Sequence, residues 1–311
     1  MPDDNGGSKT MALLSHYTSR EGLEGIAQSK RFRATNFLQL NDASEYFYAW
    51  EILQKEALRV TISRMPEGAV PATVDLDAHA ASSTAAFKGL IQSSGDRGLM
   101  YVASFATTST EDHERRGILT LWDRYTQHRG YCLQFAEEDI RKMLELELWK
   151  GSYAALSLER VTYGVDIGTY EFKTLCYQLA QIWLLQAARA RPDLRIEPAY
   201  QDMWAETVFH RKLMEFCARH KDPCFEDERE MRIFAFPADQ ARAHFMTGIT
   251  AVKKRHRTPG GRVYIDLGEY WDFALTPRRI IIGTKATPNI SGVMALYDPI
   301  PEVAHANLPV V

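Results

Sequence analysis

Apolar and polar positions alternate over short segments near both ends of the chain, whereas apolar positions recur at helical spacing through its middle. A two-residue period predicts strands, and a period near 3.6 predicts helices. The predicted strands are residues 12–17, 31–37, 98–105, 131–135, 160–165, 228–236, 262–267 and 278–282. Residues 136–220 read as mostly helical. Strands on both sides of a helical middle predict an α+β fold with an antiparallel or split sheet.

Two helices near the start of the chain have clear beginnings. Ser19 is a favoured N-cap residue and precedes a helix expected to reach Gln28. Asp42 is the expected N-cap of a longer helix, and Glu45 completes a capping box. That helix is expected to run to about Ser63.

Composition limits the class of protein. Residues 1–10 are polar and read as a tail, and residues 11–311 are expected to form a single domain in which 136–220 is a candidate insertion. The net charge of −3 supplies no global field that would attract nucleic acid. No signal peptide and no stretch long enough to cross a membrane is visible. The four cysteines are far apart and form no Cys-x-x-Cys pair, which fits a cytoplasmic protein without a metal site.

The segment His16-Tyr17-Thr18 lies between a predicted strand and the first helix. Such a junction directs backbone N–H groups and an imidazole toward one point, where an anionic or ribose-bearing ligand would bind. The alternative is a structural histidine, which is the commoner role for a histidine on its own.

A second cluster, Glu228-Arg229-Glu230-Met231-Arg232, comes late in the chain. On a strand, Glu228, Glu230 and Arg232 would share one face. Charges on one face of a central strand are costly unless they line a wet cleft or pair with each other. The pattern leaves open whether the cluster is a ligand site or an ion-paired face.

Several further residues have weaker signals. Ser104 ends an apolar strand, Asn41 stands beside a helix cap, and Trp122 and Tyr125 have the spacing of core residues on a helix. A basic run in a predicted hairpin loop is the best candidate for contact with nucleic acid. Its cationic members are Lys253, Lys254, Arg255 and Arg257.

Taken in order, these segments resemble a bacterial and phage-associated family of unknown function. Its shared motifs are His-Tyr-Thr with Gly-Leu-x-x-Ile, Leu-Asn-Asp-x-x-Glu, Ser-Phe, Trp-x-x-Tyr, Glu-x-Glu-x-Arg and Ile-Ile-x-Gly. The matching segments begin here at His16, Leu40, Ser104, Trp122, Glu228 and Ile280. Met231 departs from the family, which usually has tryptophan at this position.

The opening of that family is in turn similar to the opening of DNA-targeting ADP-ribosyltransferase toxins. This resemblance implies a split antiparallel β-sheet of the ADP-ribosyltransferase type with a largely helical insertion. It also implies an enzyme that cleaves the nicotinamide–ribose bond of NAD, with NAD as substrate and no metal. A toxin or a phage-defence effector is the expected biological role.

The resemblance implies roles for the carboxylates and the histidine. Glu230 is the first choice for the catalytic carboxylate that faces the positive charge developing on the ribose, and Glu228 is the second. The other glutamate would act as general base. His16, as a neutral imidazole, would hydrogen-bond a ribose hydroxyl.

The remaining expected contacts to NAD come from polar and aromatic residues. Thr18 and the helix N-terminus after it would meet phosphate or adenine-side oxygens, and Tyr17 or Tyr125 would stack on nicotinamide. Arg232 would either pair with the pyrophosphate or hold Glu230 in place. Asn41 and Ser104 complete the expected set.

Two other classes of function stay open. One is a non-catalytic nucleotide or nucleic-acid binding module of the same fold, which would not need two unpaired carboxylates beside an anionic ligand. The other is a structural or partner-binding protein, which is favoured if the Glu/Arg face forms closed salt bridges.

Overall fold

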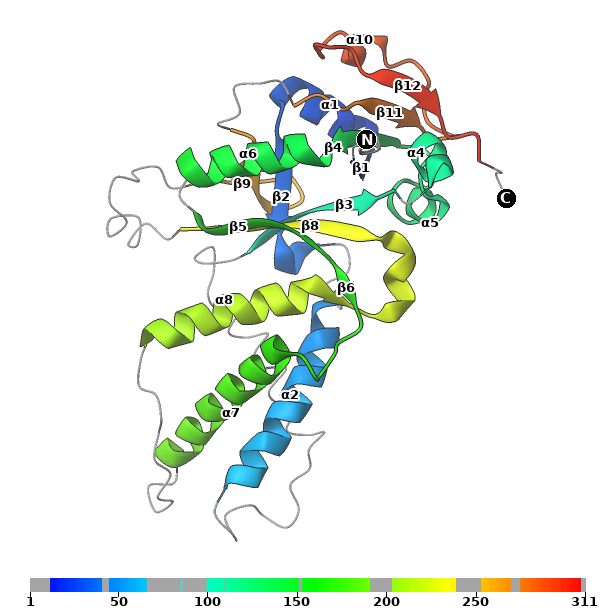
Figure 1. Ribbon diagram of the computed structural model, residues 1–311. Helices are drawn as coiled ribbons and strands as arrows, with labels where there is room; N and C mark the ends of the chain where they lie inside the picture. Colours follow the sequence, from blue (N-terminus) through cyan, green and yellow to red (C-terminus); the bar gives the residue numbers. More distant parts are fainter. Residues whose placement is uncertain are drawn as a thin grey trace, which may run out of the picture. The chain divides into compact units, whose positions relative to one another are not determined.

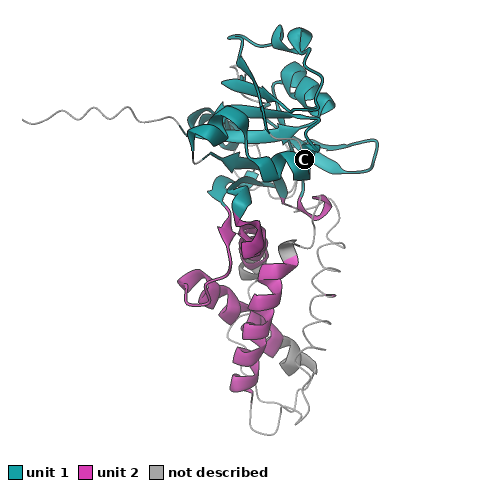
Figure 2. Ribbon diagram, turned by 90° about the vertical axis from the view of Figure 1, so that its right-hand side faces the viewer, with its two compact units in different colours: residues 1–36, 101–160, 227–311 teal, residues 37–100, 161–226 magenta. Residues whose placement is uncertain are grey.

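The computed structural model describes residues 12–40, 45–65, 85, 100–108, 110–150, 153–190, 203–238, 253–269 and 275–308. The chain divides into two compact units, each assembled from separate segments (Figure 2). Unit 1 comprises residues 1–36, 101–160 and 227–311, and unit 2 comprises residues 37–100 and 161–226. The helical segment expected at 136–220 is therefore shared between the two units.

Unit 1 is built on a ten-stranded, mostly antiparallel sheet (Figure 1). Its strands are β1 (Leu13–Thr18), β2 (Phe32–Asn36), β3 (Tyr101–Thr107), β4 (Tyr131–Ala136), β5 (Tyr153–Arg160), β8 (Glu230–Pro237), β9 (Arg255–Arg257), β10 (Val263–Leu267), β11 (Arg279–Ile282) and β12 (Glu302–His305). The main path runs β12-β11-β4-β1-β3-β2-β10-β9, and β8 joins β3 to β5. The expectation of a mixed α and β fold with a mostly antiparallel sheet is confirmed.

Short helices accompany the sheet of unit 1. They are α1 (Arg20–Ser29), α4 (Glu111–Arg116), α5 (Leu119–Leu121), the π-helix η2 (Trp122–Thr126), α6 (Glu137–Lys150) and α10 (Ser291–Met294). The 3-10 helix η3 (Pro223–Glu228) leads from unit 2 into unit 1.

The first helix follows its local sequence closely. The Ser19 hydroxyl accepts a hydrogen bond from the backbone N–H of Gly22, so Ser19 caps α1 as expected. Leu23, Ile26 and Ala27 are the buried residues of this helix. The helix ends at Lys30, whose left-handed backbone turns the chain into β2.

The described part of unit 2 contains three long helices and three short elements. The helices are α2 (Glu45–Arg64), α7 (Tyr170–Ala190) and α8 (Met203–Arg219), and the short elements are η1 (Phe37–Gln39) and the strand pair β6 (Thr162–Tyr163) and β7 (His220–Lys221). Trp50, Leu53 and Ala57 of α2 are buried. The capping residue Asp42 and the candidate site residue Asn41 lie outside the described residues.

One short helix and one strand boundary depend on local contacts. Thr110 caps the short helix α4 by accepting from the N–H of His113. The late strand was expected to begin at Glu228, but β8 begins at Glu230. Arg229 has a φ of 47°, and this left-handed backbone interrupts the extended chain between the two glutamates.

No helix of the described segments is long and apolar enough to span a bilayer. All four cysteines are described and none forms a disulfide. Within the described chain, no group of three or more His, Cys, Asp or Glu residues is arranged to hold a metal ion.

Candidate functional site

The sheet of unit 1 opens beside the middle of β3. One edge of β3 pairs with β8 from Tyr101 to Ala106. The other edge pairs with β1 only at Ala106 and Thr107 and with β2 only at Tyr101 and Val102. Residues 103–105 therefore have no partner in β1 or β2, and these two strands diverge on either side of them.

His16 lies at this opening. Its Nδ1 is 3.0 Å from the backbone carbonyl oxygen of Ser104. A carbonyl only accepts hydrogen bonds, so Nδ1 carries the proton and Nε2 presents a lone pair. Nε2 forms no hydrogen bond to any residue of the described chain. The Ser104 strand edge thus fixes the imidazole as a hydrogen-bond acceptor at its outer nitrogen.

The surroundings of His16 keep its imidazole neutral at physiological pH. Phe32 and Phe105 lie with ring centroids 5.7 and 5.5 Å from the imidazole. Burial lowers the pKa of His16 from its usual 6.5, and the hydrogen bond to Ser104 offsets only part of this effect. A neutral ring in this tautomer can accept a hydrogen bond at Nε2.

Both the hydroxyl and the ring of Tyr17 contact other residues of unit 1. Its hydroxyl oxygen accepts a hydrogen bond from the backbone N–H of Ile118 at 2.6 Å, and its ring meets Trp122 edge-on with centroids 5.1 Å apart. Gly117 has a φ of 79°, and a Cβ there would lie 2.9 Å from the Tyr17 hydroxyl. The expectation that Tyr17 stacks on nicotinamide is not supported, because its ring and hydroxyl are both engaged.

Thr18 is fitted against the start of α1. A Cβ on Gly22 would lie 1.9 Å from Thr18 Oγ1, so only glycine allows this approach. The N–H of Gly22 is already bonded to the Ser19 hydroxyl at 3.2 Å. A ligand oxygen at this helix end would have to use Thr18 or the other N–H groups of the first turn.

Glu230 and Arg232 form a buried ion pair on β8. The Nε and Nη2 atoms of Arg232 donate to the two carboxylate oxygens of Glu230 at 2.6 and 2.9 Å. The two residues are 4% and 3% exposed. Of the two roles expected for Arg232, the geometry agrees with holding Glu230 and leaves no exposed guanidinium for a pyrophosphate.

Glu228 lies apart from this pair, so the expectation that Glu228, Glu230 and Arg232 share one strand face is wrong for Glu228. The reason is the left-handed Arg229, whose carbonyl oxygen accepts from the N–H and hydroxyl of Thr107 at 2.9 and 3.1 Å. This contact holds the chain in its turned conformation and directs Glu228 away from the strand.

The carboxylate of Glu228 meets two residues of η2. Arg124 Nη1 donates to one of its oxygens, and the Tyr125 hydroxyl lies 3.5 Å from the other. Glu228 is buried, whereas the Tyr125 side chain is 45% exposed and the Arg124 side chain 43% exposed. Glu228 is thus a buried carboxylate that bonds to two half-exposed side chains.

The backbone that carries Arg124 and Tyr125 is unusual. η2 is a single-turn π-helix, and the two residues after it, Gln127 and His128, both have left-handed backbones with φ of 50° and 61°. Such conformations cost free energy and concentrate at functional sites. Sequence reasoning missed Arg124, although its place inside the Trp-x-x-Tyr motif was a signal.

The structure joins some of the expected residues and separates others. The register places Ala106 opposite Glu230 and Ser104 opposite Arg232, so these four side chains share one face of the sheet. The His16 side chain lies on the other face with Phe105 and reaches β3 through the Ser104 carbonyl. The two groups therefore lie on opposite faces of the sheet.

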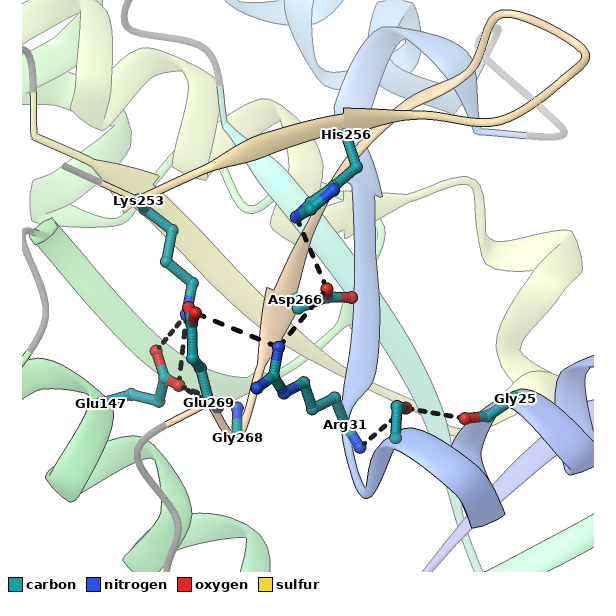
Figure 3. Close-up of polar contacts among 9 residues, drawn as sticks. Gly25, Arg31, Glu147, Lys253, His256, Asp266, Gly268 and Glu269 are labelled. Carbon is teal, nitrogen blue, oxygen red and sulfur yellow. Dashed lines mark hydrogen bonds and ion pairs between the residues drawn. The ribbon is translucent and has the colours of Figure 1, made fainter.

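The basic run 253–257 is not the loop that was expected. Lys253 is buried and pairs with Glu147 at 2.9 Å and with Glu269 at 3.0 Å (Figure 3). Arg255 begins β9 and donates to the Tyr101 hydroxyl at 3.2 Å. Only Lys254 and Arg257 of the four cations are exposed, so the predicted nucleic-acid contact through Lys253 is wrong.

Part of the chain is similar to a described protein family. The family described as protein of unknown function (DUF2971) matches residues 121–233. The expected similarity to a family of unknown function is confirmed over this span, which includes Tyr125, Glu228 and Glu230 but not His16. No curated protein and no solved structure matches the chain.

Proposed function

We propose that the protein binds NAD across the opening between β1 and β2 and cleaves its nicotinamide–ribose bond. The observation that carries the proposal is the neutral His16 imidazole, which is fixed by Ser104 and presents an acceptor nitrogen at a break in the sheet. NAD-cleaving ADP-ribosyltransferases, which the sequence resembles, also combine a histidine, an aromatic residue and a late glutamate on a split sheet.

The chemistry requires an anionic group near the ribose. The bond between the anomeric carbon and the pyridinium nitrogen breaks, its electron pair leaves with neutral nicotinamide, and positive charge develops on the ribose. A fixed carboxylate stabilises that charge. A hydroxyl or amine of the acceptor, or water, then bonds to the anomeric carbon and loses its proton to a general base.

Glu228 suits the charge-stabilising role better than Glu230. The partner of Glu230 is the buried Arg232, whereas the partners of Glu228 include Arg124 and Tyr125, which are half-exposed. The Tyr125 ring beside this carboxylate would stack on the nicotinamide. The structure thus favours the second choice from the sequence for the reacting carboxylate, with Glu230 held in a supporting pair.

The test is release of nicotinamide from NAD by the purified protein, measured by chromatography with and without a cell lysate as source of acceptor. Glu228→Gln should abolish release while preserving the melting temperature. Glu226→Gln is the matched control, because this glutamate is exposed on the same 3-10 helix two residues earlier. Full activity of Glu228→Gln would refute the role of Glu228, and loss of release in a stable Glu230→Gln variant would transfer that role to Glu230.

A second candidate is a nucleotide-binding module without catalysis, and the buried Glu230–Arg232 pair favours it because closed ion pairs need no reacting ligand. In that case NAD or another nucleotide would raise the melting temperature of the protein without release of nicotinamide. The same assay therefore separates the two candidates.

A further inference from the structure

The π-helix η2 is tied to the sheet of unit 1 at its C-terminal end. The backbone N–H of Lys285 donates to the carbonyl oxygen of His128 at 2.9 Å, and the N–H of Gly283 donates to the carbonyl oxygen of Gly130 at 3.0 Å. Both donors lie in the segment that follows β11. The backbone at His128 is therefore held in place by the chain that leaves the sheet.

One side-chain contact leads from His128 back across the turn. His128 Nε2 lies 2.7 Å from Asp123 Oδ1, five residues earlier, which is the spacing of one π-helical turn. An ionised carboxylate only accepts hydrogen bonds, so Nε2 is the donor. Nδ1 of the same ring is buried and has no hydrogen-bond partner among the residues that the structure describes. The contact to Asp123 thus orients the buried imidazole, and the imidazole in turn holds an aspartate whose side chain is 64% exposed.

The backbone of the turn needs such support. Gln127 and His128 are both left-handed, a conformation that a Cβ disfavours. The carbonyl oxygen of Trp122 accepts from the Thr126 hydroxyl at 3.0 Å and from the His128 N–H at 3.2 Å. The bond from His128 to Asp123 closes the same turn a second time, through side chains. Because a strained backbone persists where several contacts determine it together, loss of this bond should let the turn relax.

We propose that Asp123 and His128 are positioning residues, whose hydrogen bond fixes the turn so that Arg124 and Tyr125 meet the carboxylate of Glu228. Arg124 follows Asp123 directly, and both Arg124 and Tyr125 bond to Glu228. Their side chains are half-exposed, so the direction of the backbone contributes strongly to where they point. The inference rests on the role of Glu228 in the proposed function, and the pair acts through its neighbours rather than on NAD.

The first test needs no NAD. It is NMR of the arginine Nε–H groups, in which the signal of Arg124 is assigned with Arg124→Lys and the effect of losing its partner is measured in Glu228→Gln. We expect Asp123→Ala to move the Arg124 signal in the same direction as Glu228→Gln does. Asp123→Asn should leave the signal near its wild-type position, because the amide oxygen still accepts from His128 Nε2. Asp112→Ala is the matched control, since it removes an exposed aspartate that pairs with arginines of α4, and should have no effect.

The second test is release of nicotinamide from NAD. Asp123→Ala and His128→Gly should lower kcat/KM by up to about 100-fold, because small displacements of groups around a reacting centre have effects of this size. Glycine keeps the left-handed backbone at low cost, so a loss in His128→Gly reports on the ring. Asp123→Asn should retain most of the activity.

The two tests separate this inference from the proposed function. An unchanged Arg124 signal in folded Asp123→Ala would overturn the inference, whatever the rate of release. Wild-type release in Asp123→Ala would overturn it as well. If the wild type releases no nicotinamide, the proposed function fails, and the Arg124 signal alone decides whether the pair positions the turn.

Discussion

Replacement of Arg232 by methionine tests the buried ion pair at the centre of the candidate site. In the folded protein the guanidinium donates to both oxygens of Glu230, and both side chains are at most 5% exposed. Arg232→Met would leave the carboxylate in its buried position without this partner. Removal of one member of a buried pair typically costs about 3–5 kcal/mol of unfolding free energy.

Chemical denaturation and thermal melting measure this loss. For a domain of roughly 150–250 residues, each kcal/mol lowers the melting temperature by about 2–4 °C, so the expected decrease is on the order of 10 °C. The double variant Glu230→Leu/Arg232→Met replaces both charges by apolar groups and should recover most of the stability. Arg141→Met is the control, since it breaks an exposed i,i+4 pair with Glu137 worth about 0.3–0.5 kcal/mol.

Two results would refute this reasoning. The first is a loss below about 1 kcal/mol in Arg232→Met, the value typical of an exposed pair. The second is a double variant no more stable than the single one, because a buried charge without a partner would then not be the cause of the loss.

Three further variants test other contacts of the site. Tyr17→Phe should lower the unfolding free energy by about 1–3 kcal/mol, because the N–H of Ile118 loses its acceptor, and an unchanged denaturation midpoint would contradict this. Gly22→Ala should destabilise the protein, since the new Cβ would lie 1.9 Å from Thr18 Oγ1, and Thr18→Ala in the same chain should relieve part of the loss in thermal melts. His16 has a lowered pKa in the folded state, so its contribution to stability is complete above pH 6.5 and is lost as the unfolded chain takes up a proton below that pH. As the pH falls from 7.5 to 5, the melting temperature of the wild type should therefore fall relative to that of His16→Gln. A constant difference between the two melting temperatures would exclude the buried neutral imidazole.

Features set by local sequence were predictable. The start of α1 and its buried face follow from a serine cap and from residues three and four apart, and both agree with the structure. The ion pair of Glu230 and Arg232 was one of two alternatives, since residues two apart on a strand share a face.

Features set by distant contacts were not predictable. The left-handed Arg229 that separates Glu228 from β8 is held by Thr107. Lys253 lies in a basic run that is typical of an exposed loop. Its partner Glu147 of α6 is distant in sequence, so the sequence alone does not show that the two residues pair. The opening beside Ser104 depends on which residues of β1 and β2 pair with β3. The sequence of one strand does not specify which residues of another strand it pairs with.

We propose that NAD occupies the opening between β1 and β2 with a ribose hydroxyl on His16 Nε2. It is tested most directly by nitrogen NMR of the histidine side chains during titration with NAD, in Glu228→Gln so that the substrate persists. We expect the free protein to show His16 protonated at Nδ1, and NAD to shift the His16 Nε2 resonance while that of the buried His220 stays constant. An unchanged His16 signal at saturating NAD would contradict the account.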